Sequence, residues 1–301
     1  MHVLELDGID WADPAVEVPP GPVMGVSRSP LPPAAAALLQ RLTFTIAPDG
    51  PGRHWIDAPV PDLDDLPAEP MRLLHDLLPI TATLPVPEAL VVESLAYSTL
   101  LAGPVFRRWR EHTPRRPVPD SSDPVLLTRE DDVLTVTLNR PERHNAFGRA
   151  VRDGLLEALS VADLDPTIRS VMLTGNGPSF CSGGDLDEFG TTPDVVTAHV
   201  LRLDRSAGLA VHRLRDRTTA LLHGACIGAG IEIPAFAGRV LAQHDAWFCL
   251  PELRFGLVPG AGGTVSITKR IGRWRTAYLV ATGARLDLTT ALRWGLVDGR
   301  A

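Results

Sequence analysis

Two glutamates stand alone in apolar stretches that each adjoin a glycine-rich turn. Glu232 lies in "HGACIGAGIEIPAF" (223–236), and Glu252 lies in "AWFCLPELRFGLVPGAGG" (246–263). A buried carboxylate needs hydrogen bonds, a counter-charge or a shifted pKa, because removing it alone from water is very costly. Each glutamate by itself is explained equally well as a charge that complements a helix N-terminus and as a proton-transfer group.

Two glycine-rich segments follow the order strand, turn, helix. They are "LTGNGPSFCSGGDLDEF" (173–189) and "LLHGACIGAGIEIPAF" (221–236). A turn of this kind leaves backbone N–H groups free at the start of a helix, where they can bind a phosphate. Two such turns that face each other could instead place two N–H donors on one oxygen atom, which is an oxyanion hole.

Other chemistries fit the sequence less well. "GAGIEI" lacks the third glycine of a dinucleotide-binding motif, and the chain contains no P-loop motif. Ser182 in "FCSGG" lacks the frame of a nucleophile elbow, and His223 and His244 are interpreted as structural. Because their spacing fits no zinc pattern, the three cysteines are expected to be reduced core residues: Cys181, Cys226 and Cys249.

Five stretches, in order, make the chain resemble the crotonase or enoyl-CoA hydratase/isomerase superfamily. They are "LNRPERHNAF" (138–147), "SFCSGGDLDEF" (179–189), "HGACIGAGIEIPAFAGRVLA" (223–242), "FCLPELRFGLVPGAGGT" (248–264) and "ATGARLDLTTALRWGLVD" (281–298). The resemblance covers roughly residues 123–301. It implies an α/β fold, a spiral of β-β-α units that encloses an acyl-CoA pocket.

The resemblance implies catalytic roles for four residues. The backbone N–H groups of Gly184 and Ala229 would form the oxyanion hole, although the family commonly has glycine at the second position. Glu232 and Glu252 fall on the two glutamates that hydratases use. Two carboxylates held close in a dry pocket cannot both ionise. One can therefore take a proton from water while the other delivers a proton to carbon.

The resemblance also implies contacts with CoA. The segment from Arg143 to Ala146 and the backbone from Cys181 to Gly183 match segments that contact the adenine and the pantetheine. Asp185 is better explained as a cap of the next helix than as a reacting group. The predicted substrate-contacting residues are Arg143, His144, Asn145, Ala146, Cys181, Ser182, Gly183, Asp185 and Gly228.

Two departures from the family pattern stand out. About 120 residues precede the crotonase-like part. The sequence stops at Ala301, before the helices that usually follow the "GLVD" motif in the family. We therefore hypothesise that the N-terminal helices, chiefly 87–112, cover the pocket. The missing helices also weaken the expectation of a homotrimer or homohexamer.

Proline divides the chain into two parts. Of 28 prolines, 21 precede residue 125, so the first part is expected to consist of short helices and extended links. We predict a Pro-rich, mainly helical region over 1–122 and a crotonase-like core over 123–301.

The first region is expected to contain helices at 32–44, 68–80 and 87–112 and a linker at 111–124. The core is expected to contain a hairpin at 124–141 and helices at 147–165 and 194–217.

The composition limits the possible partners. The chain of 301 residues has a net charge of −7, which argues against nucleic acid as the main partner. The basic run at 107–116 is expected to be the solvated face of a helix. Without a run of about 18 apolar residues we expect no membrane span, and without a signal peptide we expect a cytoplasmic protein.

The interpretation that we favour is an enoyl-CoA hydratase of fatty acid metabolism, or an isomerase that uses the same two glutamates. It needs no cofactor or metal beyond the CoA that is part of the substrate. One alternative is another crotonase-type reaction on a specialised acyl thioester, such as cofactor-independent oxygenation or hydrolysis, although Glu252 argues against oxygenation. The other alternative is a non-catalytic protein that binds acyl-CoA or takes part in assembly.

Overall fold

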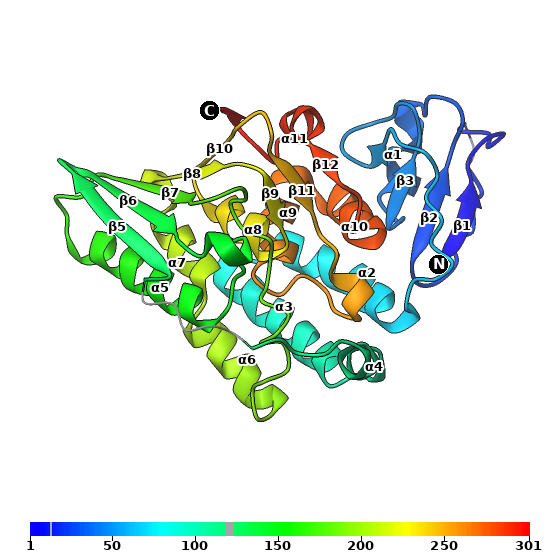
Figure 1. Cartoon of the computed structure of the whole chain (residues 1–301). Helices are drawn as coiled ribbons and strands as arrows, with labels where there is room; N and C mark the ends of the chain where they lie inside the picture. Colours follow the sequence, from blue (N-terminus) through cyan, green and yellow to red (C-terminus); the bar gives the residue numbers. More distant parts are fainter. Residues whose placement is uncertain (13, 118–122) are drawn as a thin grey trace.

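The computed structural model describes residues 1–12, 14–117 and 123–301, and Figure 1 shows the path of the chain. Residues 118–122, in the predicted linker at 111–124, lie outside the described residues. From residue 123 onward strands and helices alternate, as expected for an α/β fold. The division of the chain at residue 122 remains a prediction.

A six-stranded sheet forms the frame of the second part of the chain. In spatial order its strands are β13 (Gly299–Arg300), β10 (Arg239–Ala242), β8 (Thr218–Leu222), β7 (Ser170–Gly175), β6 (Val133–Leu138) and β5 (Val125–Glu130). The predicted hairpin is β5 and β6, which pair antiparallel with Val125 opposite Leu138. The other neighbours in this sheet pair in parallel. Side chains along β6 alternate between half-buried and buried, which is the period of a strand with one face on the core.

The chain alternates between this sheet and a smaller sheet of three strands. In spatial order these are β12 (Leu286–Asp287), β11 (Trp247–Cys249) and β9 (Ala225–Ile227). Strand β8 is followed by β9 and then by helix α8 (Ala229–Glu232). Strand β10 is likewise followed by β11, by a short 3-10 turn η5 (Glu252–Phe255) and by helix α9 (Gly263–Ile271). Each unit supplies one strand to each sheet and then a helix, which confirms the predicted spiral of β-β-α units.

The other helices of this part agree with the sequence pattern except at one break. The helix predicted at 147–165 is α5 (Arg149–Leu164). The single helix predicted at 194–217 is two helices, α6 (Val195–Asp204) and α7 (Ala207–Arg213). The chain breaks there because the Ser206 side chain accepts a hydrogen bond from the Leu209 N–H, so a new helix begins at this cap. The last two helices are α10 (Arg273–Thr282) and α11 (Leu288–Trp294).

Residues 2–56 contain a four-stranded parallel sheet that the sequence pattern does not predict. Its strands are β1 (His2–Glu5), β2 (Val23–Val26), β3 (Phe44–Ile46) and β4 (Trp55–Ile56). The helix predicted at 32–44 is much shorter, a 3-10 turn (Pro33–Ala35) followed by one turn of α1 (Ala36–Leu39). Strands of two to four residues are too short to show an alternating pattern.

Three helices complete the N-terminal region, residues 1–117. They are α2 (Ala68–Thr83), α3 (Val86–Leu101) and α4 (Pro104–His112). The prediction of a helix at 68–80 is confirmed. The helix predicted at 87–112 breaks at Gly103, because Pro104 cannot continue α3 and instead begins α4. Among the described residues no single helix is long and apolar enough to span a bilayer; α3 and α4 meet the test only together, as a pair bent by 62°.

One hydrophobic core joins the N-terminal region to the β-β-α spiral. It extends from Met24 in β2 through Leu90 in α3 to Val297 near the C-terminal end. In Figure 1, α2 and α3 run beneath α8 and α9, and α6 lies beside α3. A second, smaller cluster, which includes Leu6 and Leu39, lies within the first 47 residues. The helices of the N-terminal region are therefore packed into the same core as the spiral.

Candidate active site

The two glycine-rich segments lie side by side. Cys181 forms a parallel bridge with Cys226, and the Ile227 N–H donates to the Cys181 carbonyl at 3.0 Å. This approach requires glycine, because a Cβ at Gly230 would lie 2.2 Å from the Cys181 carbonyl oxygen. The two turns therefore face each other, as an oxyanion hole built from both of them requires.

A cavity of about 250 Å³ opens between these segments and α3. Its wall includes the two predicted oxyanion-hole residues, Gly184 and Ala229, and both predicted glutamates, Glu232 and Glu252. Apolar residues from both parts of the chain complete it, among them Leu90, Leu101, Phe147 and Phe189. The four residues that the sequence assigns to chemistry thus share one cavity.

The backbone N–H groups of Gly184 and Ala229 are free to bind a ligand. Neither donates to an acceptor within the described part of the chain. Ala229 is the first residue of α8, so its N–H has no partner inside the helix. Gly184 has no room for a side chain, because a Cβ there would lie 2.5 Å from the Phe189 ring.

Glu232 is buried and held by the turn that begins α9. Its Oε2 accepts hydrogen bonds from the N–H groups of Ala261 at 2.8 Å and Gly263 at 2.9 Å. Burial raises the pKa of Glu232 to about 7, and the two N–H donors oppose that rise. Its carboxyl group therefore titrates near neutral pH.

Glu252 faces the same cavity, but its carboxyl group has weaker hydrogen bonding than that of Glu232. Its Oε2 is buried and has no hydrogen-bond partner among the described residues. A Cβ placed on Gly228 would lie 2.7 Å from Glu252 Oε1 and 3.6 Å from Glu232 Oε1, so both carboxyl groups converge on this glycine. Burial and then the charge of Glu232 raise the pKa of Glu252 well above its usual range. Glu252 therefore holds its proton when Glu232 has lost its own.

The cavity wall contains a third carboxyl group that the sequence interpretation missed. Glu93 of α3 is 2% exposed and lines the cavity together with Ser94 and Tyr97. It accepts hydrogen bonds from the N–H of Gly262 at 2.8 Å and from the N–H and hydroxyl of Thr264 at 2.9 and 2.7 Å. A signal was present: "LVVESLAY" (90–97) also places one carboxylate in an apolar run.

Most of the predicted CoA contacts do not line the cavity. Asp185 lines the cavity, whereas the other eight do not: Arg143, His144, Asn145, Ala146, Cys181, Ser182, Gly183 and Gly228. Asn145 is fully buried, and its amide nitrogen donates to the carbonyls of Asn176, Ser179 and Phe180. The two predicted CoA segments contact each other, since the Ser182 N–H donates to the His144 carbonyl at 2.9 Å. Contact of these residues with CoA remains a prediction.

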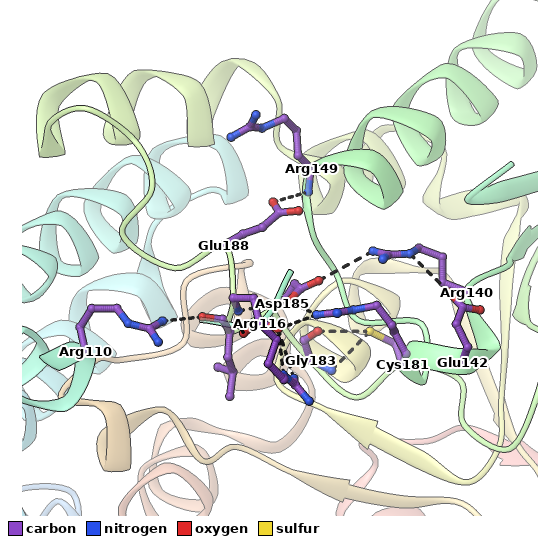
Figure 2. Close-up of polar contacts among 12 residues, drawn as sticks. Arg110, Arg116, Arg140, Glu142, Arg149, Cys181, Gly183, Asp185 and Glu188 are labelled. Atoms are coloured by element: carbon purple, nitrogen blue, oxygen red, sulfur yellow. Dashed lines mark hydrogen bonds and ion pairs between the residues drawn. The ribbon is translucent and has the colours of Figure 1, made fainter. Parts of the chain in front are cut away.

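The Asp185 carboxylate contacts two arginines and a backbone N–H. Arg143 Nη2 lies 2.8 Å from Asp185 Oδ1 and 2.7 Å from Asp187 Oδ2. Arg140 Nη1 lies 3.7 Å from Asp185 Oδ2, a pair that Figure 2 draws. The Asp187 N–H also donates to Asp185 Oδ1 at 3.2 Å. Asp185 therefore stabilises the loop after Gly184, in a turn rather than at the start of a helix, so the expected helix cap is not found. The Arg143 guanidinium is committed to the same network.

The N-terminal region holds this loop from the other side. Arg110 of α4 donates to the Leu186 carbonyl at 2.6 Å, and Arg115 donates to the Phe189 carbonyl at 2.9 Å (Figure 2 draws the first). The Arg116 N–H donates to Asp187 Oδ1 at 2.9 Å. These arginines belong to the run 107–116, whose solvated-face interpretation is wrong for the half-buried Arg110. Arg115 and Arg116 are exposed, although they lie beyond the end of the helix at His112. All three fix the segment that presents the Gly184 N–H.

The cysteines agree with the sequence interpretation. All three are free thiols, with Cys181 and Cys226 buried and Cys249 half-buried. Burial raises the pKa of Cys181 to about 12 and that of Cys249 to about 11. Neutral thiols of this kind pack as small apolar side chains.

Comparison with known proteins places these features in a family. The family model described as "Enoyl-CoA hydratase/isomerase" matches residues 128–299. A probable enoyl-CoA hydratase, echA8, of Mycobacterium tuberculosis is 31% identical over 175 residues, which cover 58% of this chain and 67% of that protein. The 1,2-epoxyphenylacetyl-CoA isomerase of Escherichia coli is 34% identical over 178 residues, 58% of this chain and 68% of that protein.

A solved structure agrees with these sequence matches. The putative enoyl-CoA hydratase of Thermobifida fusca, crystallised in complex with CoA, has a TM-score of 0.53 and 27% identity. The match covers 59% of this chain and 72% of that chain. The chain belongs to the enoyl-CoA hydratase/isomerase family, and its activity is of the type that this family performs.

Proposed function

We propose that this protein adds water across the double bond of an α,β-unsaturated acyl-CoA thioester, or shifts that bond, in the cavity between α3 and α8. The observation that carries the proposal is the convergence of two buried carboxyl groups and two uncommitted backbone N–H groups on one cavity. Relatives named as hydratases and as an isomerase support both forms of the reaction.

The N–H groups of Gly184 and Ala229 would bind the thioester oxygen. They donate to that oxygen most strongly when it carries the negative charge of an enolate, so they stabilise the transition state more than the substrate. Loss of one such donor typically costs about a hundred- to a thousand-fold in rate. Alanine at 229 keeps the N–H that this role needs.

The two glutamates would move the protons. Glu232, with a pKa of about 7, is the base near neutral pH, and Glu252, whose pKa lies well above the usual range, is the acid. A water molecule gives a proton to Glu232 while its oxygen bonds to the β-carbon, and the π electrons move to the thioester oxygen. The enolate then takes the Glu252 proton at the α-carbon. The pair returns to its starting state when Glu232 passes its proton to Glu252.

A panel of enoyl-CoA thioesters of different chain length and aromaticity tests this proposal. Each thioester is incubated with the protein, and hydration is measured as loss of enoyl absorbance and as a mass gain of one water. At least one thioester should be hydrated, or isomerised without mass change. Oxygen uptake without either change would support the oxygenation alternative and contradict the proposal.

Several properties rest on the sequence alone. We propose that the reaction needs no cofactor beyond the CoA of the substrate, that the protein works in the cytoplasm, and that it does not bind nucleic acid. Assembly into a homotrimer or homohexamer is likewise a proposal. Sedimentation of the purified chain, with and without acyl-CoA, measures the state of assembly directly.

A further inference from the structure

The turn that begins α9 binds two carboxyl groups from opposite parts of the chain. Its four consecutive N–H groups alternate between them, since Ala261 and Gly263 donate to Glu232 whereas Gly262 and Thr264 donate to Glu93. The alternation depends on Gly262, whose φ of +106° is a left-handed conformation that favours glycine. A shift of this turn toward one carboxyl group would change its contacts with the other.

Glu93 is enclosed on every side by groups of the cavity. Glu232 of α8 and Glu252 of η5 face it, and Tyr97 lies on its own helix. Helix α6 brings Arg202 and also His199, whose Nδ1 lies 2.9 Å from the Ser94 hydroxyl. Arg202 does not neutralise it directly: its Nη1 donates to the hydroxyls of Ser94 and Ser98, and its guanidinium lies 4.4 Å from the Tyr97 ring centre. Three carboxyl groups therefore share one buried site, and within the described part of the chain none of them forms a salt bridge, so they do not ionise independently.

We propose that Glu93 is a positioning residue that the N-terminal region supplies to the active site. Its carboxyl group holds the 261–264 turn against Glu232, and its protonation state sets the number of negative charges beside the substrate. The role in turnover rests on the proposed function, whereas the shared turn and the shared charge do not.

The order of ionisation explains how Glu93 would act. Burial, with the charge of Glu232 second, raises the pKa of Glu93 from 4.5 to about 8, against the opposing donors on Thr264 and Gly262. Glu93 and Glu232 titrate as a coupled pair, so once one of them has ionised the other ionises only at a higher pH. The second charge would disfavour the enolate, so turnover should fall as the pH rises through about 8.

Glu93→Gln tests the charge without using activity. Between pH 4.5 and about 8 the folded chain holds a proton on Glu93 that the unfolded chain has released, so stability falls as pH rises. The variant lacks that dependence. Denaturant unfolding from pH 5 to 9 measures the unfolding constants of the wild type and the variant. The wild-type constant divided by the variant constant should grow by up to about tenfold per pH unit below pH 8. Glu88→Gln, on the exposed face of the same helix, is the matched control and should match the wild type.

A second arm measures turnover of a thioester that the wild type hydrates. The wild-type rate should fall above pH 8, and the Glu93→Gln rate should not, with KM changed less than about threefold. Thr264→Val removes the hydroxyl that donates to Glu93 Oε2 and should move the wild-type fall to higher pH, because the ionised form loses a donor. This variant also carries the test if Glu93→Gln does not fold.

The outcomes are distinct. A destabilisation by Glu93→Gln that is constant from pH 5 to 9, with an unchanged pH profile, would show a permanently ionised structural cap and overturn the proposal. A wild type that hydrates no thioester but shows the predicted difference in the pH dependence of unfolding would contradict the proposed function and leave Glu93 as a shared proton site.

Discussion

The two parts of the chain supply different things to one cavity. The spiral from residue 123 onward contributes the free N–H groups of Gly184 and Ala229 and the carboxyl groups of Glu232 and Glu252. The N-terminal region contributes one wall through α3, the arginines that hold the loop after Gly184, and Glu93. A segment outside the family match, which covers residues 128–299, thus lines the same cavity as the candidate site residues within it.

Removal of the N-terminal region is the strongest way to break this comparison. Deletion of residues 1–120 would expose the apolar residues that α2 and α3 cover, and it would take Glu93 from the α9 turn. We expect an insoluble or inactive product, measured as soluble yield, circular dichroism and thioester hydration. A soluble core with full activity would refute the idea that these helices cover the pocket.

The two glutamates of the spiral should give the next largest effect. Glu232→Gln and Glu252→Gln each remove one proton carrier, so each should lower kcat by about 10²- to 10⁴-fold. Binding of acyl-CoA should change little, because the amide keeps the size of the side chain. Binding is measured by calorimetry with a saturated acyl-CoA, and His244→Gln, at an exposed position outside the cavity wall, is the control. Equal losses of binding and of rate would show a structural role instead.

The sequence predicted the spiral better than the N-terminal region for a physical reason. Glu232 and Glu252 are lone carboxylates beside glycine-rich turns, and each turn is a local feature that the sequence displays. Glu93 shows the same lone carboxylate, but its meaning depends on Gly262, which lies 169 positions away. The four-stranded sheet was missed because strands of two to four residues carry no readable period, whereas the six-residue strand β6 does.

Helix breaks were a second source of error, and both had local signals. Pro104 follows Gly103 and begins a new helix, and Ser206 caps one. In each case an apolar helical period continued across the break and hid it. The arginines at 110, 115 and 116 were missed for the reason that applies to Glu93, because their acceptors lie more than 70 positions away.

The pH dependence of the wild type sharpens the comparison between the two carboxyl groups on the α9 turn. Glu232 must be ionised to accept a proton, and burial places its pKa at about 7. The value of kcat/KM should therefore fall about tenfold for each pH unit below 7, while the fold is retained. Hydration rates from pH 5 to 8 at constant ionic strength measure this, with circular dichroism as the control. A value of kcat/KM that stays constant from pH 7 down to pH 5 would mean that Glu232 behaves as an ordinary glutamate, with a pKa near 4.5.

The smallest expected effect concerns the joint between the two parts. Asp187 Oδ2 lies 2.7 Å from Arg143 of the spiral and 3.2 Å from Arg116 of the N-terminal region. Although burial alone would raise it, the hydrogen bonds from Arg116 and Arg143 hold the pKa of Asp187 at about 2. Asp187→Asn should lower the free energy of unfolding at pH 7 by about 1.5–3 kcal/mol, the usual value for hydrogen bonds to a charged group.

The pH dependence of this loss in the free energy of unfolding distinguishes the Asp187 ion pairs from an exposed surface ion pair. Because the folded pKa lies below its usual value of 3.8, the stabilisation is present above pH 4 and is lost as the pH falls through about 2. The difference between Asp187→Asn and the wild type should therefore shrink over that range in denaturant unfolding. Asp76→Asn breaks the exposed pair between Arg72 and Asp76, which are 56% and 53% exposed, and should cost less than about 0.5 kcal/mol. Equal losses for the two variants would mean that Asp187 does no more for the joint than an ion pair in open solvent.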